Sequence, residues 1–378
     1  MAWLGTWAKR VKLTIDSGDI DAEQTWHHLR VHISASTGHS SRDVSFVFDE
    51  LESDDNRKKI ALTKNDGETQ LYAEIEKWDD ANEQAELWVS RDGWTWASDA
   101  DTDLYLYYDS THADNTDYVG DKGLAGRDGP RENVWDGDFA TVHHMGDETT
   151  SSITDSTSNN NDGTKGAAGE PTEITTGKIA NAQNFDGGDH INHGNSLSPL
   201  DHMTIEAWAK ISSQAVDKQI VSKGYDGTNT QWELKTTSAD AKVSFRAWIG
   251  SSLGVESLSN MTAGVWYYLV GTREGGIGWE IFWNGATDNT NGDDAPIETT
   301  EDLNIGAVDI NGSPGQQWTG DIDEVRISVG SSAPRSDAWI KATYESDRDH
   351  LLDWGSEEEA PAAGVPAHFM YYQRLRRA

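Results

Sequence analysis

The sequence predicts an all-β protein made of two tandem antiparallel β-sandwiches followed by a flexible C-terminal tail. The chain has 378 residues, enough for two domains that each bury a core. Short segments alternate apolar and polar side chains with the period of two that is typical of strands, whereas apolar stretches with a helical period are scarce. The 36 glycines and 17 tryptophans also favour strands joined by tight turns.

The balance of charge is strongly acidic, with 65 Asp and Glu against 30 Lys and Arg and a formal net charge of −35. Nucleic-acid and anionic-membrane surfaces need basic patches, so we expect neither partner. Most of this charge is expected to lie on a solvated surface, although carboxylate-rich loops could hold a hard cation such as Ca²⁺. Cysteine is absent, which excludes disulfides and thiol chemistry.

Residues 1–10 lack the apolar region of a signal peptide. No window approaches the roughly 18 apolar residues that a membrane span needs. We therefore expect a chain that is made in the cytoplasm, or an exported chain whose leader has already been removed.

The first domain is predicted to cover residues 1–125. Residues 11–15 and 29–33 alternate as half-buried strands, and His28 and His32 fall on the polar face, where we expect solvated side chains. Further strands are predicted at 44–48, 71–78, 85–89 and 103–108, a spacing typical of a sandwich.

Four of these segments carry a resemblance in their order along the chain: residues 45–46, 73–79, 85–89 and 103–108. Together they resemble an uncharacterised β-sandwich family of unknown function that often precedes a concanavalin A-like module in microbial and viral surface proteins. The resemblance covers about residues 3–120. It implies a jelly roll and no known catalysis.

Residues 126–137 are rich in glycine and charge and are predicted to be a linker, followed by a second domain at 138–355. His143 and His144 would point to opposite faces of a strand and could not share a metal. In the strand at 319–328, alternation places Asp323 on the side of the β-branched aliphatic residues, where a carboxylate needs a partner. A short helix is predicted at 336–344.

The second domain resembles the laminin-G-like, concanavalin A-like family. The segments that carry this resemblance are 155–163, 185–187, 204–208, 220–224, 283–285, 303–307 and 320–327. The family implies a two-sheet jelly roll that mostly binds carbohydrate or protein, often with calcium. It also implies a structural Ca²⁺ site in which Asp323 joins the loop from Asp155, with Asn160 or Asn161 offering oxygens. The alternative is that Asp323 accepts backbone amides.

An enzyme is not expected, because neither Glu74 with Glu76 nor Asp321 with Asp323 lies in the strand context that glycosidases of this superfamily use. Binding is the better class, since tryptophan stacks on sugar faces and anchors protein contacts. The exposed candidates are Trp94, Trp96, Trp248, Trp279 and Trp318, although strand tryptophans are often core.

Residues 356–378 are predicted to be a linker and a docking peptide, which is basic and aromatic on an otherwise acidic chain. Its candidate docking residues are Phe369, Tyr371, Tyr372, Arg374, Arg376 and Arg377. By analogy with virion proteins of tailed phages, we expect a non-enzymatic phage surface protein, either a capsid decoration or a fibre-like adhesin. Its partners would be other virion proteins or further copies of itself. Host surface glycans could be a further partner. The alternative is a secreted or cell-surface lectin-like module.

Overall fold

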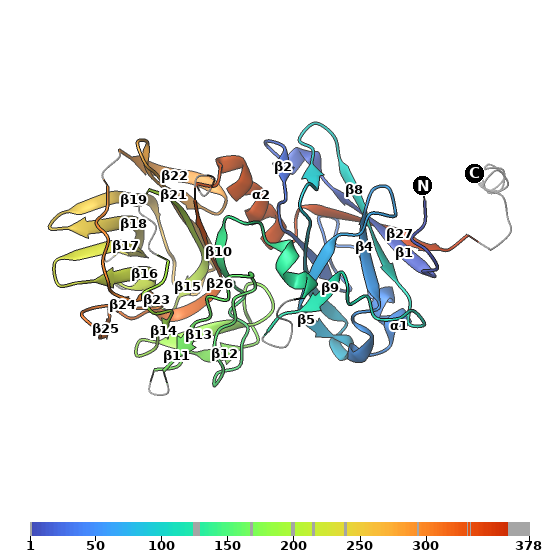
Figure 1. The fold of residues 1–378 in the computed structure, drawn as a ribbon, viewed down its shortest axis with the longest axis horizontal. Helices are drawn as coiled ribbons and strands as arrows, with labels where there is room; N and C mark the ends of the chain where they lie inside the picture. Colours follow the sequence, from blue (N-terminus) through green and yellow to red (C-terminus); the bar gives the residue numbers. More distant parts are fainter. Residues whose placement is uncertain are drawn as a thin grey trace.

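A computed structural model describes residues 2–361, apart from short gaps at 124–128, 167–168, 198–200, 214–215, 238–239, 293–294, 331 and 333. The chain forms two antiparallel β-sandwich units side by side, with few helices, as the sequence predicts (Figure 1). Within the described residues, no helix is long and apolar enough to cross a membrane. The candidate docking residues at 369–377 lie outside the described part of the chain.

The first unit is a sandwich of two four-stranded sheets. Its strands are β1 (Lys9–Ile15), β2 (Gln24–Thr25), β3 (Leu29–Ile33), β4 (Ile60–Lys64), β5 (Tyr72–Asp79), β6 (Gln84–Ser90), β7 (Thr95–Trp96), β8 (Thr102–Tyr108), β9 (Val119–Asp121) and β27 (Leu352–Glu359). One sheet has the order β27–β1–β8–β4 and the other the order β3–β6–β5–β9, in which β9 runs parallel to β5. Strands β2 and β7 pair with each other. The short 3₁₀ turns are η1 (Ser17–Asp19), η2 (Asp54–Asn56) and η3 (Asp80–Asn82).

The second unit is a larger sandwich of an eight-stranded and a seven-stranded sheet. Its strands are β10 (Phe139–His143), β11 (Thr164–Lys165), β12 (Thr172–Ile174), β13 (Ala182–Asp186), β14 (Ile191–Asn192), β15 (His202–Ile211), β16 (Gln219–Tyr225), β17 (Asn229–Thr236), β18 (Lys242–Ile249), β19 (Ser252–Asn260), β20 (Tyr267–Glu274), β21 (Gly278–Trp283), β22 (Ala286–Asn291), β23 (Leu303–Ile305), β24 (Val308–Asp309), β25 (Pro314–Gly315) and β26 (Thr319–Val329). The larger sheet has the order β12–β13–β26–β15–β20–β21–β22, with β10 also paired to β26. The smaller sheet has the order β11–β14–β23–β16–β17–β18–β19. Apolar side chains from both sheets meet in one core.

The chain returns to the first unit at its C-terminal end, which the sequence did not predict. Helix α2 (Asp337–Asp347) follows the second sandwich, and strand β27 then pairs antiparallel with β1 (Figure 1). Leu352 and Trp354 of β27 alternate into the core of the first unit. Residues 352–359 therefore belong to the first sandwich. The sequence analysis placed the end of the second domain at 355 and a linker from 356, and both expectations are wrong for this segment. The three glutamates at 357–359 interrupt the alternation of apolar and polar residues, so the sequence did not predict a strand there.

Residues 44–48 do not form the predicted strand. The chain instead forms helix α1 (Phe46–Leu51), in which Val47, Phe48 and Leu51 are buried. Their spacing fits one face of a helical turn, whereas alternation in a strand would have divided them between two faces. The helix predicted at 336–344 is confirmed as α2.

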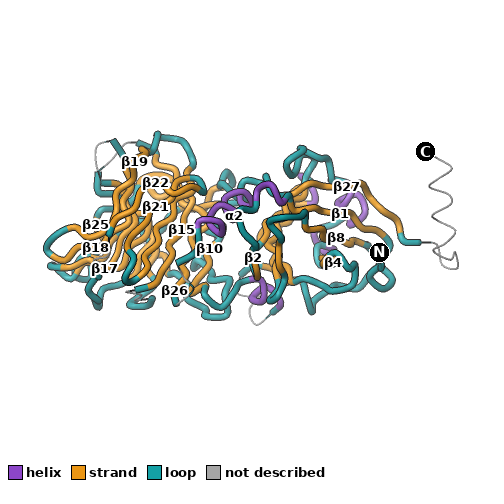
Figure 2. Tube along the Cα trace, turned by 90° about the horizontal axis from the view of Figure 1, so that it is seen from above, coloured by secondary structure: helices purple, strands orange, loops and turns teal. Residues whose placement is uncertain are grey.

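The two units share an apolar interface built on the outer face of the eight-stranded sheet. Trp88 of β6 meets Trp208 and Tyr268 of the large sheet, together with Trp339 of α2, in one buried cluster. Helix α2 lies between the two sandwiches in the view from above (Figure 2). The described part of the expected linker at 126–137 also packs here, because η5 (Pro130–Val134) buries Arg131 and Val134 and Trp135 joins the cluster. One outer face of the second sandwich is thus covered by the first unit.

Candidate functional site

The outer face of the seven-stranded sheet carries a groove. Strands β17 and β18 alternate, so Trp232, Leu234 and Phe245 enter the core while Arg246 and Trp248 point outward. The groove has a volume of about 310 Å³. It is lined by Tyr225, Thr230, Glu233, Lys235, Arg246, Trp248, Val308, Ile310 and Gln316.

The groove combines an aromatic surface with fixed polar groups. Trp248 is 37% exposed, an unusual value for so large an apolar side chain in this protein. Arg246 donates from Nε to Glu233 Oε1 at 2.8 Å, and Gln219 donates to the second oxygen of Glu233 at 2.7 Å. Lys235 Nζ lies 3.2 Å from Gln316 Oε1. These contacts hold the polar side chains in place beside the indole, which is the arrangement that binds a ligand with one apolar face and several hydroxyl groups.

A second concentration of functional groups lies buried between the two units, around His144. Its Nδ1 lies 2.9 Å from Glu324 Oε1 and 3.6 Å from Glu76 Oε2, and its Nε2 lies 3.4 Å from Glu74 Oε2. Burial lowers the pKa of His144, but the carboxylates of Glu324, Glu76 and Glu74 outweigh burial and raise that pKa well above its usual value. His144 is therefore a cation that joins β5 of the first unit to β26 of the second.

Indole and guanidinium groups complete this network. Trp88 donates to Glu76 at 2.8 Å and Trp135 donates to Glu74 at 2.8 Å. Arg326 is fully buried and donates to Glu324 at 2.8 Å and to both oxygens of Asp347 at 3.2 Å.

Sequence reasoning did not find this network. It expected His28 on a solvated face, yet that side chain is buried among the aromatic rings of the interface. A strand pattern shows which side chains leave the core of one sandwich, but it does not show that a second sandwich covers them. The available signal was the pair Glu74 and Glu76 at alternate positions of one strand.

The match to a known family falls on the second unit. Residues 185–341 match the family described as the concanavalin A-like lectin/glucanases superfamily. These residues form a concanavalin A-like domain. No curated protein matches the chain.

The solved structures that match the chain share little sequence identity with it. Domain 4 of AbnA, an extracellular arabinanase from Geobacillus stearothermophilus in complex with arabinotriose, has a TM-score of 0.46 and 17% identity, over 54% of this chain and 96% of that one. The ligand-binding domain of botulinum neurotoxin serotype D in complex with N-acetylneuraminic acid has a TM-score of 0.41 and 13% identity, over 55% of this chain and 50% of that one. Trypanosoma rangeli sialidase in complex with sialic acid has a TM-score of 0.40 and 12% identity, over 74% of this chain and 45% of that one.

Four of the five candidate tryptophans are core residues. Trp94 and Trp96 are 3% and 0% exposed within the first sandwich. Trp279 and Trp318 are fully buried in the concanavalin A-like domain, where Trp279 packs edge-on against Phe245 with ring centroids 5.1 Å apart. The expectation that these four are exposed is wrong, because their indoles fill the interiors of the two sandwiches. Trp248 alone of the five reaches solvent.

The expected calcium ligands of the concanavalin A-like domain are directed at backbone amides. Asp323 accepts from the amides of Lys178, Ile179 and Glu324 at 2.8–3.0 Å. Asp155 accepts at one oxygen from the amides of Val142 and Thr157, and at the other from the amide of Asn161 and the Thr157 hydroxyl. The amide groups of Asn160 and Asn161 donate to the carbonyls of Ser158 and Ala140. The amide donors around Asp323 match the alternative of backbone partners for this carboxylate.

The position of Asp323 also differs from the strand pattern. A β-bulge in β26 sets two residues against Ala207, and Glu324 there has a φ of 47°. Ile322 and Val325 therefore both face the core, while Asp323 lies on the opposite face at the domain interface.

Added calcium is expected to leave the melting temperature of the metal-free chain unchanged, because both carboxylates already have partners. The measurement is a thermal melt across a calcium series, with equal concentrations of magnesium as the control for general effects of ionic strength. A melting temperature that rises with calcium and not with magnesium would restore the calcium site.

Stability is expected to fall between pH 6.5 and 8 through Glu206. Burial raises the pKa of Glu206 to about 7, so at pH 6.5 most folded chains hold a proton that the unfolded chain has lost, and by pH 8 the folded chain has largely lost it too. Such a group stabilises the fold fully at low pH, and this contribution is lost as the pH rises through the folded pKa. The buried His27 and His28 have lowered pKa values and oppose this trend only below their usual pKa of 6.5.

The measurement is the free energy of unfolding in urea at pH 6.5 and at pH 8, for the natural chain and for E206Q. We expect the natural chain to lose on the order of 1 kcal/mol more than E206Q, which keeps the shape of the side chain but cannot titrate. Equal losses in the two proteins would show that Glu206 does not titrate in this range.

Proposed function

We propose that the protein is a non-enzymatic carbohydrate-binding protein whose ligand lies in the groove beside Trp248. The observation that carries this proposal is the partly exposed indole, which lies next to polar side chains that already hold one another in place. Sugars offer an apolar ring face for stacking and hydroxyl groups for hydrogen bonds. A groove of about 310 Å³ suits a small number of sugar units better than the broad, flat contact that a folded protein partner would make.

We propose no hydrolytic activity, because neither expected pair of carboxylates lines one cleft together. Glycosidases place two carboxylates on either side of one glycosidic bond. Glu74 and Glu76 are buried in the domain interface, and Asp321 and Asp323 are buried in β26. Among the described residues that line the groove, Glu233 alone carries a carboxylate.

Affinity electrophoresis in non-denaturing gels tests both parts of the proposal. Retardation in gels that contain one or more soluble polysaccharides is expected, with no release of reducing sugar from the same polysaccharides after prolonged incubation. Migration that is unaffected by every polysaccharide would count against binding, and release of reducing sugar would overturn the non-enzymatic assignment.

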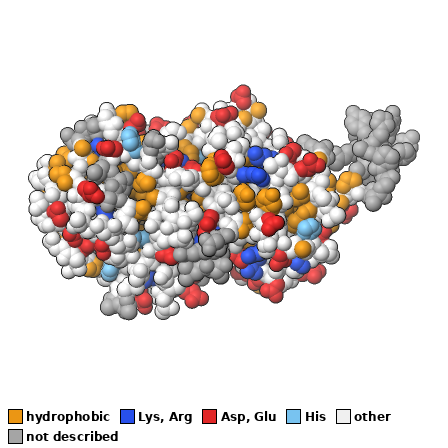
Figure 3. Space-filling view, in the orientation of Figure 1, with side chains coloured by type: hydrophobic (Ala, Val, Ile, Leu, Met, Phe, Trp, Pro, Cys, Tyr) orange, Lys and Arg blue, Asp and Glu red, His pale blue; other side chains and the backbone are white. Residues whose placement is uncertain are grey.

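The setting that we propose is the surface of a phage particle, as a capsid decoration or a fibre-like adhesin that binds host glycans. The arrangement of the chain supports this setting, because the groove-bearing sheet and the end of β27 lie at opposite ends of the molecule (Figure 1). Anchoring through residues beyond β27, to other virion proteins or to further copies of this chain, would leave the groove facing outward. Acidic side chains lie over both units on the face drawn in Figure 3, as suits a surface in contact with water. The alternative setting is a secreted or cell-surface lectin-like module.

Deleting residues 362–378 tests the anchoring part of this proposal. The deletion leaves β27 intact. Loss of association with particles, or a smaller assembly by light scattering, with unchanged polysaccharide binding is the expected result. Unchanged association would favour the free lectin-like module.

A further inference from the structure

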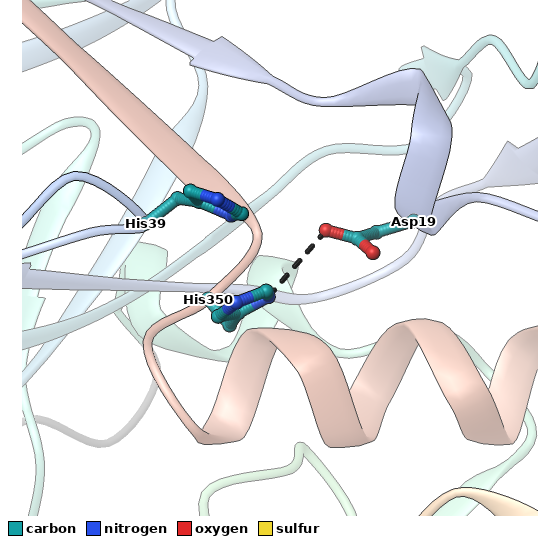
Figure 4. Close-up of side chains that lie close together, drawn as sticks. All are labelled: Asp19, His39 and His350. Atoms are coloured by element: carbon teal, nitrogen blue, oxygen red, sulfur yellow. Dashed lines mark ion pairs between the residues drawn. The ribbon is translucent and has the colours of Figure 1, made fainter.

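Three metal-ligating side chains from separate segments converge at the place where the C-terminal return meets the first sandwich. Asp19 ends η1, His39 lies in the turn after β3, and His350 follows α2 (Figure 4). Each residue offers one ligand atom, and these atoms lie within 4.8 Å of one another. The centroids of the His39 and His350 rings are 4.3 Å apart, and the rings are tilted by 48° to each other.

Two carboxylate oxygens lie near the ring of His350. His350 Nδ1 lies 3.5 Å from Asp19 Oδ2 and 3.2 Å from Glu345 Oε2. Yet His350 Nδ1 and Glu345 Oε2 are buried atoms without a hydrogen-bond partner, so these contacts are close without being aligned for hydrogen bonds. Arg348 also approaches Glu345, with its Nε 3.5 Å from the same oxygen, and is 37% exposed.

These separations suit a shared metal ion better than direct pairing. Zinc holds nitrogen and oxygen ligands at about 2.0–2.2 Å in a tetrahedron, which places neighbouring ligand atoms roughly 3.4 Å apart. The 3.5 Å between His350 Nδ1 and Asp19 Oδ2 lies close to this separation. Imidazole ligands favour zinc and similar transition metals, whereas calcium and magnesium prefer oxygen ligands alone.

The backbone already holds the segments together. The amide of His39 donates to the carbonyl of Leu352 at 2.8 Å, and the amide of Asp16 donates to the carbonyl of Leu351 at 3.1 Å. The amide of His350 donates to the carbonyl of Glu345 at 3.0 Å. A metal would therefore bind ligands whose main chains need little ordering, and small movements of side chains would complete the site.

We propose that Asp19, His39 and His350 form a binding site for a divalent transition metal of the zinc type. The ion would join η1 and the turn after β3 to the connection between α2 and β27. It would therefore fix the returning strand, and with it helix α2, to the first sandwich. This site is independent of the groove, and its failure would leave the proposed carbohydrate binding untouched.

The test is calorimetric titration of zinc chloride into the metal-free full-length chain and into H39A, H350A and H112A. His39 is exposed and its side chain makes no hydrogen bond within the described structure, so H39A is expected to fold normally. His112 is a half-buried histidine outside the cluster, and H112A is the control. Its ring stacks on Trp7 and bonds to the carbonyl of Ala113. Melting temperatures in metal-free buffer show whether each variant folds.

We expect one zinc per chain, affinity reduced about tenfold or more in H39A and in H350A, and affinity unchanged in H112A. Cobalt in place of zinc is expected to give the visible absorption of a four-coordinate ion in the natural chain, and to lose it in H39A. Absence of zinc binding by the natural chain, or equal binding by H39A and H112A, would overturn the proposal.

Discussion

Replacing Arg326 with methionine is expected to lower the free energy of unfolding by about 3–5 kcal/mol, since removing one partner leaves the other charges of a buried network uncompensated. Arg326 is fully buried, and its guanidinium donates to Glu324 and Asp347 and lies 4.7 Å from the centre of the Trp88 ring. Methionine fills much of the same space without the charge. The carboxylates would then have to be buried unpaired or take up protons.

The measurement is the urea denaturation midpoint, with R57M as the matched control. Arg57 also pairs with a carboxylate, that of Asp121 at 2.7 Å, but its side chain is 33% exposed. Exposed pairs contribute at most about 1 kcal/mol, so R57M is expected to unfold close to the natural chain. If R326M and R57M lost similar amounts of stability, the buried network would not be what holds the two units together.

Replacing Trp248 with alanine is expected to weaken carbohydrate binding by about 2 kcal/mol or more, which is roughly 30-fold in the dissociation constant. The side chain supplies the aromatic face of the groove, and its exposure means that the fold does not depend on its burial. The melting temperature of W248A is therefore expected to stay close to that of the natural chain.

The matched control is L258A on β19 of the same sheet. Leu258 is 68% exposed and does not line the groove. L258A is expected to bind polysaccharide like the natural chain. Isothermal titration with a polysaccharide that retards the chain in gels measures all three proteins, and equal affinity of W248A and L258A would place the ligand elsewhere.

Alternation along the strands predicted most of the fold, because a side-chain period of two is set by local geometry. The concanavalin A-like domain was predicted differently, by the resemblance of motifs that follow one another in order to those of a known family. Local patterns could not show that β27 pairs with β1, since that contact joins residues more than 300 positions apart. Nor could they show the bulge beside Glu324, which moves Asp323 from the core side of its strand to the domain interface.

The candidate site was predicted less well than the fold for a related reason. Tryptophan is common both in sandwich cores and on sugar-binding surfaces, so residue type alone did not separate Trp248 from Trp279 or Trp318. The deciding property is exposure, which depends on the neighbouring strands. The network around His144 could not be predicted for the same reason, because burial there depends on how the two sandwiches pack. Glu74 and Glu76 come from one sandwich and Glu324 from the other.

The measurement that tests the central claim most directly is a glycan array probed in parallel with the natural chain, W248A and L258A. The account predicts that the natural chain and L258A bind the same related set of glycans and that W248A binds none of them. Binding of that set by W248A at the level of the natural chain would contradict the claim that the groove beside Trp248 is the carbohydrate site.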